Sequence, residues 1–211
     1  MPLRPCRLAA MLMLAIAAPA AAQEDPARCA AADPAAQWRS AASEDDRRRL
    51  RSWRRAWTEA LAKAQAEHGP AVTAEGALLR PDAALPRATP PPGPYRCRTI
   101  KVGAQGEGGL DFIAYPWFEC RIAAEGGELR LEKLTGSQRP VGRLLADTDR
   151  RMIFLGTLVL SDEQRALRYG EDRERDMAGI LERIGDSRWR LVFPYPRFES
   201  TLDVIELVPA S

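Results

Sequence analysis

Two spacings of hydrophobic residues divide this chain into different kinds of structure. From residue 44 to residue 68, apolar side chains recur every three or four positions, which is typical of one face of an α-helix. After residue 94 the spacing approaches two, as in strands with one buried face. The helical positions are Leu50, Trp53, Trp57, Ala60, Leu61 and Ala64, and Trp189, Leu191 and Phe193 show the strand spacing. The pattern predicts an amphipathic helix followed by a β-rich domain.

The expected boundaries follow from residues that start and stop helices. Ser43 offers an N-cap hydroxyl, and the histidine, glycine and proline at 68–70 predict the end of the helix. Residues 23–43 are rich in alanine, proline and aspartate, so we expect a loosely ordered arm there. Residues 69–94 become rich in proline, which favours an extended, semi-rigid linker.

Residues 95–208 alternate between short apolar runs and turn residues such as Gly126-Gly127. Eight or nine strands with hairpin-length connections tend to curl into a barrel or fold into a sandwich. We therefore predict a mainly β protein with an N-terminal α-helix. Its β domain is expected to be an up-and-down or calycin/lipocalin-like antiparallel β-barrel of about eight strands.

The first 22 residues have the pattern of a secretory signal peptide. Arg4 and Arg7 precede an apolar stretch, Leu8–Ala18, and small residues follow up to Ala22. The apolar stretch is shorter than the about 20 residues that a transmembrane helix needs. We expect cleavage near Ala22, a periplasmic or secreted location, and no transmembrane segment afterwards.

An oxidising compartment would allow disulfides. Cys97 and Cys120 both lie in predicted strands, so a bridge between them is the simplest pairing. Cys29 is then left over, either as an incidental free cysteine or as a thiol that reacts or forms an intermolecular bridge.

Composition excludes several functional classes. The residues after 22 carry equal numbers of acidic and basic side chains, which argues against a nucleic-acid binder. His68 is the single histidine of the chain, and the usual catalytic and nucleotide-binding motifs are missing from the sequence. We expect no metal, no cofactor and no catalytic residue. The alternative is a histidine-independent hydrolase with paired carboxylates, for which Asp111, Glu119 and Glu132 are available.

Aromatic residues supply the candidate binding surface: Trp53, Trp57, Tyr115, Trp117, Phe118 and Tyr195. Trp53 and Trp57 either pack on the barrel, which we favour, or enter a membrane or partner interface. Pro116 cannot donate a ladder hydrogen bond, so an edge strand or bulge is expected beside it. The aromatic residues around it either pack in the core, which we favour, or form an exposed rim for a partner. The aromatic and proline residues of 193–198 are expected to form a second corner of this surface.

Several short sequence segments resemble those of an uncharacterised family of exported Gram-negative bacterial proteins, which is known only as a domain of unknown function. The most specific is Thr135-Gly136-Ser137-Gln138-Arg139-Pro140, and the resemblance extends from Leu50 to Val208. It implies no activity, cofactor or site residue. The chain also resembles periplasmic protease-inhibitor barrels more loosely, at the level of the fold. The segment Gly127–Leu131 is similar to a hairpin of those proteins.

The sequence therefore predicts an exported, non-catalytic β-barrel that binds a small apolar ligand or an envelope protein, as a monomer. A protease-inhibitor-like role is the remaining alternative.

Overall fold

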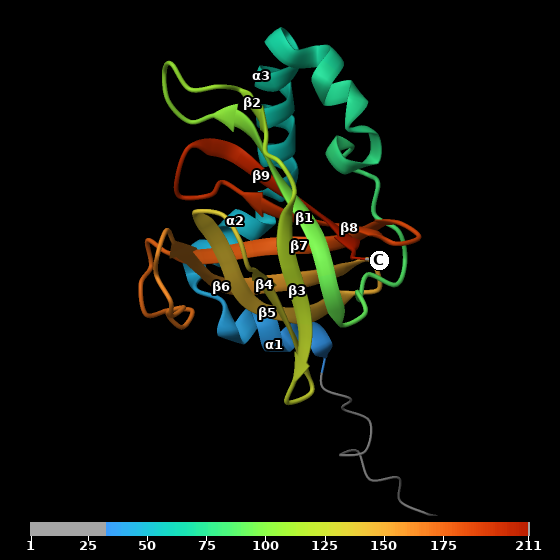
Figure 1. Cartoon of the computed structure of the whole chain (residues 1–211), viewed down its shortest axis with the longest axis vertical. Helices are drawn as coiled ribbons and strands as arrows, with labels where there is room; N and C mark the ends of the chain where they lie inside the picture. The colour runs from blue at the N-terminus through green and yellow to red at the C-terminus, as the bar shows by residue number, and fades with distance from the viewer. Residues whose placement is uncertain (1–32, 211) are drawn as a thin grey trace, which may run out of the picture. The chain divides into compact units, whose positions relative to one another are not determined.

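The computed structural model describes residues 33–210, in which three α-helices precede a closed sheet (Figure 1). The helices are α1 (Pro34–Ala41), α2 (Glu44–Arg51) and α3 (Trp53–Ala74), followed by the short 3-10 helix η2 (Gly76–Leu79). The strands are β1 (Gly93–Ala104), β2 (Phe112–Ala114), β3 (Phe118–Glu125), β4 (Glu128–Lys133), β5 (Gln138–Thr148), β6 (Arg151–Leu160), β7 (Asp176–Gly185), β8 (Arg188–Pro194) and β9 (Ser200–Pro209). The expected signal peptide, Cys29 and most of the expected arm lie outside the described residues.

Eight strands form the predicted antiparallel barrel. The order runs from β1 through β3 to β9, and β9 pairs back with β1 from Tyr95↔Pro209 to Ala104↔Ser200. From β3 to β9, neighbours in the barrel are consecutive strands of the chain. The β3–β4 hairpin turns on Gly126 and Gly127, whose φ angles of 58° and 86° suit glycine. This confirms an up-and-down β-barrel of eight strands.

Strand β1 has two partners on its second edge. Its first half pairs with β3, and its second half pairs with the short strand β2. Between β2 and β3 the chain leaves the sheet at Tyr115, Pro116 and Trp117. The interruption lies where Pro116 has no N–H to donate to a ladder.

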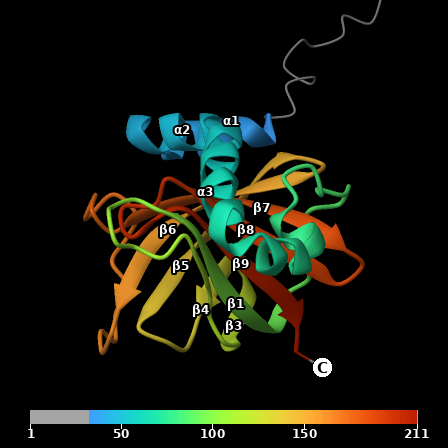
Figure 2. The same ribbon diagram turned by 90° about the horizontal axis from the view of Figure 1, so that it is seen from above.

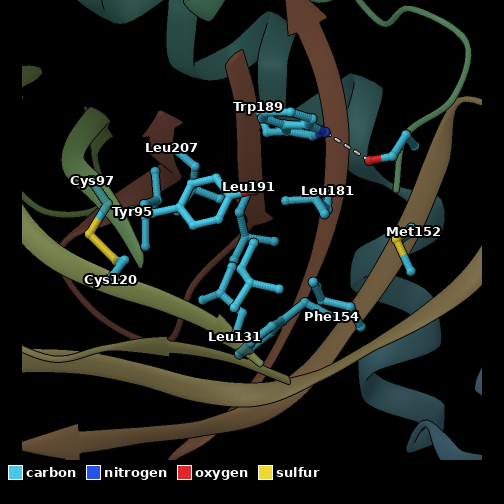
Figure 3. Close-up of a cluster of buried hydrophobic side chains, with 14 of the residues drawn as sticks. Tyr95, Cys97, Cys120, Leu131, Met152, Phe154, Leu181, Trp189, Leu191 and Leu207 are labelled. Carbon is cyan, nitrogen blue, oxygen red and sulfur yellow. Dashed lines mark hydrogen bonds between the residues drawn. A yellow bond between two sulfur atoms is a disulfide. The ribbon is translucent and has the colours of Figure 1, made fainter. Parts of the chain in front are cut away.

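Apolar side chains fill one end of the barrel interior (Figure 3). Cys97 and Cys120 form the predicted disulfide there, with Cα atoms 5.8 Å apart on neighbouring strands. The rings of Phe154 and Phe193 meet edge to face with centroids 5.5 Å apart. A Cβ on Gly142 would lie 2.7 Å from the Phe154 ring, so glycine gives that ring its space. Other members of this interior cluster are Tyr95, Ile122, Leu131, Leu144, Met152, Leu181, Trp189, Leu191, Ile205 and Leu207.

The helices pack on the outside of the barrel (Figure 2). Helix α3 buries Trp57 against β1, β8 and β9, with small side chains beside it. A Cβ on Gly103 of β1 would lie 2.8 Å from the Ala60 Cα, so the helix approaches the strand closely at this glycine. Helices α1 and α2 cover the outer face of β5, β6 and β7, where Trp38 Nε1 donates to Asp147 Oδ1 at 2.9 Å. Both helical layers therefore pack directly on the outer face of the sheet, each with its own buried cluster.

A buried arginine anchors the segment after α3. Arg190 on the outer face of β8 is fully buried and donates to Glu182 Oε2 at 2.6 Å. Its Nε–H donates to the same oxygen at 2.9 Å, and the other donors meet backbone carbonyls of Ala77, Leu78, Arg80 and Pro81. Since each donor faces an acceptor, burying this charge is compensated.

The expected single helix over residues 44–68 is interrupted at Ser52 (φ −88°, ψ 8°), so Leu50 on α2 and Trp57 on α3 belong to different buried clusters. Element boundaries differ from the expectation in three other places. Part of the expected arm, residues 34–41, forms α1, because Asp33 caps it and Ala35 and Trp38 bury an apolar face. Helix α3 continues past residue 68 to Ala74. His68 breaks the helical geometry (φ −122°, ψ 23°), which places Pro70 in the first turn of a second piece, where proline is tolerated.

The third difference concerns the expected linker. Residues 69–94 include the end of α3 and η2, and the rest lies along the barrel. Leu85 N donates to Arg183 O at 2.8 Å, and Trp189 Nε1 donates to Ala88 O at 2.9 Å. Hydrogen bonds thus hold the segment against the strands.

In the part of the chain described here, none of the helices has the length and apolar character needed to cross a membrane.

Candidate binding cavity in the barrel

The end of the barrel opposite the disulfide cluster contains a cavity. Strand residues line its inner wall, and α2, the loop before β7 and the loop between β8 and β9 supply its rim. About 50 Å³ is open to the centres of water-sized molecules. A single water needs about 10–15 Å³ by this measure, so the cavity has room for several waters or a short organic chain.

The inner wall is mainly apolar. Five inward-facing side chains from five strands form it: Pro140, Leu158, Met177, Phe193 and Ile205. Phe193 also packs on Phe154, so its ring separates the cavity from the filled end of the barrel. This arrangement favours an apolar group as the part of a ligand that enters first.

Two charged side chains face the interior from paired strands. Lys101 on β1 and Asp203 on β9 are register partners, and Nζ lies 3.0 Å from Oδ2. Glu199 Oε2 lies 3.1 Å from the same Nζ, and Ser200 Oγ donates to the other oxygen of Asp203. Burial alone lowers the pKa of Lys101, but the two carboxylates outweigh it and hold this pKa above its usual value. Burial raises the pKa of Asp203 despite the lysine.

Three arginines contribute to the rim of the cavity. Arg49 of α2 pairs with Asp46, Arg197 of the β8–β9 loop pairs with Asp45 at 3.0 Å, and Arg175 pairs with Glu163 at 2.6 Å. The Nε–H groups of Arg49 and Arg197 are buried and find no acceptor among residues 33–210. Unsatisfied buried donors are uncommon, and each costs about 1–3 kcal/mol.

Asp176 lies at the same rim and is buried. Its Oδ1 accepts from Gly170 N at 2.8 Å, which ties the loop before β7 to the start of that strand. Burial raises the pKa of Asp176, and the nearby carboxylate of Asp46 adds to the rise. Asp46 in turn accepts from the hydroxyl of Tyr169 in the same loop. These contacts join α2, the loop and the barrel at the rim.

The β8–β9 loop covers part of the opening. Tyr195 and Glu199 at its ends have positive φ angles of 47° and 72°, which cost energy in non-glycine residues. Gln105 Nε2 fixes the loop by donating to Pro196 O at 2.7 Å. Phe198 at the tip lines the cavity yet is 50% exposed. The loop therefore presents an aromatic ring at the entrance.

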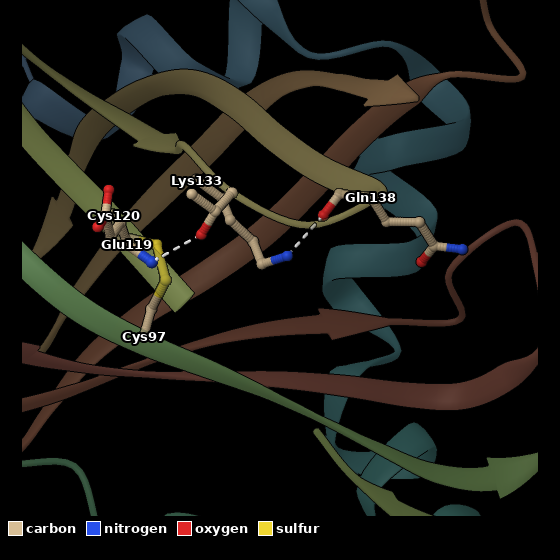
Figure 4. The surroundings of a disulfide bond; sticks show 6 residues. Cys97, Glu119, Cys120, Lys133 and Gln138 are labelled. Atoms are coloured by element: carbon tan, nitrogen blue, oxygen red, sulfur yellow. Dashed lines mark hydrogen bonds between the residues drawn. A yellow bond between two sulfur atoms is a disulfide. The ribbon is translucent and has the colours of Figure 1, made fainter. Parts of the chain in front are cut away.

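A second buried lysine, Lys133 on β4, lies near the disulfide (Figure 4). Lys133 Nζ lies 3.7 Å from the centroid of the Phe118 ring and donates to Gln138 O at 2.9 Å. Burial lowers the pKa of Lys133 to about 8.

The six aromatic residues predicted to form a binding surface do not come together. Trp57 is buried under α3, Trp53 is half-buried beneath Arg54 and Arg151, and Phe118 contacts Lys133. Tyr195 lies at the β8–β9 loop, with its hydroxyl donating to Glu59 at 2.7 Å. Within residues 33–210, no member of this set lines the cavity.

Tyr115 and Trp117 are exposed at the break between β2 and β3. The guanidinium carbons of Arg96 and Arg98 lie 4.7 and 5.3 Å from the Trp117 ring centroid. These cation–π contacts stabilise the ring where it is. Of the two alternatives for the aromatic residues beside Pro116, the exposed rim is the one present for Tyr115 and Trp117, and these side chains do not line the cavity.

The carboxylates considered for catalysis also lie outside the cavity lining. Asp111 accepts from Ala104 N at 2.8 Å in the turn after β1. Glu119 is exposed on β3, and Glu132 on β4 accepts from Arg121 at 2.6 Å. His68 marks the α3 kink, where its ring lies 6.1 Å from Phe112. In the described structure, the cavity lining includes none of these four.

Sequence reasoning missed most of the cavity. The segment 193–198, expected as a corner of the aromatic surface, supplies Phe193, Pro196, Arg197 and Phe198 to it. The sequence signal that could have indicated the cavity is the pair Lys101 and Asp203. Each is a charged residue at an inward position of a strand.

Comparison with known families confirms the resemblance. A family described as a domain of unknown function, DUF4893, matches residues 38–207, which include the barrel and most of the three helices. The search of curated proteins and the search of solved structures each returned no match. The chain therefore belongs to the DUF4893 family.

Proposed function

We propose that this protein is an exported, non-catalytic binding protein of the cell envelope, and that its barrel cavity holds a small, mainly apolar molecule. The observation that carries the proposal is the cavity itself. It has an apolar wall of Pro140, Leu158, Met177, Phe193 and Ile205 and a charged rim. An apolar pocket with a few converging polar groups is the usual form of a small-molecule site.

Two features support export. The first 22 residues have the charge, apolar stretch and small residues of a signal peptide. The Cys97–Cys120 disulfide suits an oxidising compartment such as the periplasm.

Two of the three carboxylates that line the cavity, Asp203 and Asp176, favour binding over hydrolysis. Both oxygens of Asp203 are engaged, one by Lys101 Nζ and the other by Ser200 Oγ. Asp176 accepts a backbone hydrogen bond from Gly170. Carboxylates that hold strands and loops in place are poorly suited to exchange protons with a substrate.

Methionine methyl NMR tests the proposal directly. The chain after residue 22 has two methionines: Met177 lines the cavity, and Met152 lies in the filled end of the barrel. With ¹³C-methyl-methionine labelling and 1-hexanol as the probe, we expect the Met177 signal to shift saturably and the Met152 signal to stay.

A cavity-filling variant supplies the control. Leu158→Trp places a larger ring in the cavity and should abolish the shift of Met177. Leu167→Trp changes an exposed leucine outside the cavity lining and should leave the shift intact. If 1-hexanol leaves Met177 unmoved in the wild type, or still moves it in Leu158→Trp, the cavity is not the binding site.

A further inference from the structure

We propose that the ligand of this cavity is a small carboxylate whose anionic head binds between Arg49 and Arg197 while its short apolar tail enters the barrel. The inference rests on the proposed function and deepens it by naming the chemical class of the ligand.

The first step is the convergence of the two arginines. Arg49 comes from α2 and Arg197 from the β8–β9 loop, and both line the cavity. Arg49 Nη1 donates to the carbonyl of Tyr195 at 3.3 Å, two residues before Arg197. Arg197 Nη2 donates to Asp45 Oδ2 at 3.0 Å, and Asp45 belongs to the same helix as Arg49. These reciprocal contacts hold the two guanidinium groups together at one side of the rim.

The second step concerns the donors that the protein leaves free. Acidic partners occupy Nη2 of both arginines, whereas the Nε–H of each is buried without an acceptor in the described part of the chain. A guanidinium presents its N–H groups as a planar fork that matches the two oxygens of a carboxylate. Each guanidinium keeps one unpaired Nε–H beside an occupied Nη2, so a ligand carboxylate that displaces the acidic partner would complete a two-donor fork.

The third step separates carboxylate from phosphate. Glu174 and Asp176 line the same cavity, so negative charge is already present next to the arginines. Two negative charges on a ligand head would be repelled more than one. A singly charged carboxylate therefore fits the rim better than a phosphate monoester.

The fourth step sets the size of the tail. Beyond the arginines the wall is mainly apolar apart from the Lys101–Asp203 ion pair, and Phe193 closes it at the bottom. The space of about 50 Å³ open to water-sized centres suits a chain of a few carbons and excludes a long acyl chain.

Titration of matched six-carbon probes tests the inference, with the Met177 methyl signal as the readout. Hexanoate and hexanamide have the same shape and differ in charge. We expect hexanoate to bind about tenfold more tightly at pH 7 and low salt, because its hydrogen bonds to the arginines are charge-assisted. Equal affinities, or tighter binding of hexylamine or hexyl phosphate, would overturn the carboxylate assignment.

Variants locate the effect. Arg197→Leu should reduce the preference for hexanoate to less than about twofold, and Arg197→Lys should restore only part of it because lysine lacks the fork. Asp45→Asn removes a competing acceptor and should tighten hexanoate binding about twofold. Arg51→Leu, an exposed arginine on the same helix, is the matched control and should behave as the wild type.

The probes distinguish the two possible failures. If 1-hexanol still shifts Met177 in Arg197→Leu, that variant is folded and its cavity is intact, so a lost preference for hexanoate supports the inference. If hexanoate keeps its preference in Arg197→Leu, the head group binds elsewhere and the inference is wrong while the proposed function stands. If neither hexanoate nor 1-hexanol shifts Met177 in the wild type, both proposals fail.

Discussion

At the scale of single residues, two lysines inside the same barrel meet opposite surroundings. Lys101 lies within 3.1 Å of two carboxylates, whereas the neighbours of Lys133 Nζ are a phenyl ring and a carbonyl. In residues 33–210, no carboxylate forms an ion pair with Lys133. The pKa of Lys101 is therefore held above its usual value, and burial lowers the pKa of Lys133 to about 8.

Lys133→Met should change the pH dependence of stability in a defined direction. The unfolded lysine binds protons more strongly than the folded one, so the wild type gains stability as the pH rises from about 8 to about 10.5. The gain is about 3 kcal/mol, and the variant should lack it. Urea unfolding of both proteins at pH 7 and pH 10.5 measures the difference. Parallel pH profiles would show that the Lys133 ammonium is stable in the fold.

At the scale of elements, α3 contributes to the core of the barrel domain. Trp57 is 1% exposed and lies among side chains of β1, β8 and β9, and the buried Arg190 guanidinium lies 5.0 Å from its ring. Arg51 ends α2 with an exposed side chain that pairs with Glu44. The two residues are close in sequence and differ in what they stabilise.

Trp57→Ala should lower the stability of the whole domain in one cooperative transition. Removing a buried aromatic side chain costs about 3–5 kcal/mol, a large part of the about 5–15 kcal/mol that a domain has. Arg51→Ala should change stability by less than about 0.5 kcal/mol. Urea unfolding followed by circular dichroism gives both values. Equal midpoints for Trp57→Ala and the wild type would mean that α3 folds independently of the barrel.

The helices and strands were largely predictable from the sequence, because the spacing of apolar residues and the turn residues depend on local sequence. The spacing of Trp57, Ala60 and Ala64 identified α3 and its buried face, and Gly126-Gly127 identified a hairpin. The turn at Ser52, which places Leu50 on the separate helix α2, escaped prediction. The break at His68 escaped prediction, because Pro70 ends a continuous helix but is tolerated in the first turn of a new one.

The cavity was not predictable in the same way. Lys101 and Asp203 become neighbours only when β9 pairs with β1, and a separation of 102 residues carries no local indication of that pairing. Arg49 belongs to an arginine-rich helix, where it resembles its solvated neighbours until α2 packs at the rim. Closure of the barrel, rather than any motif, creates the site.

At the scale of the whole molecule, the barrel has two unequal ends. The disulfide, Tyr95, Trp189 and Phe154 fill one end with side chains. The other end keeps a cavity whose rim is assembled from α2 and two loops. We infer that the filled end and the outer helices supply stability, which leaves the open end free to bind a ligand.

Native mass spectrometry of the protein purified from the periplasm tests the central proposal most directly. We predict the mass of a chain that begins at Gln23 and has lost two hydrogens in the Cys97–Cys120 bond. The protein should also carry a small carboxylate that is released on gentle activation. The Leu158→Trp protein should carry none. A protein that retains Met1, or wild-type and Leu158→Trp proteins with identical bound molecules, would contradict an exported barrel that holds its ligand in this cavity.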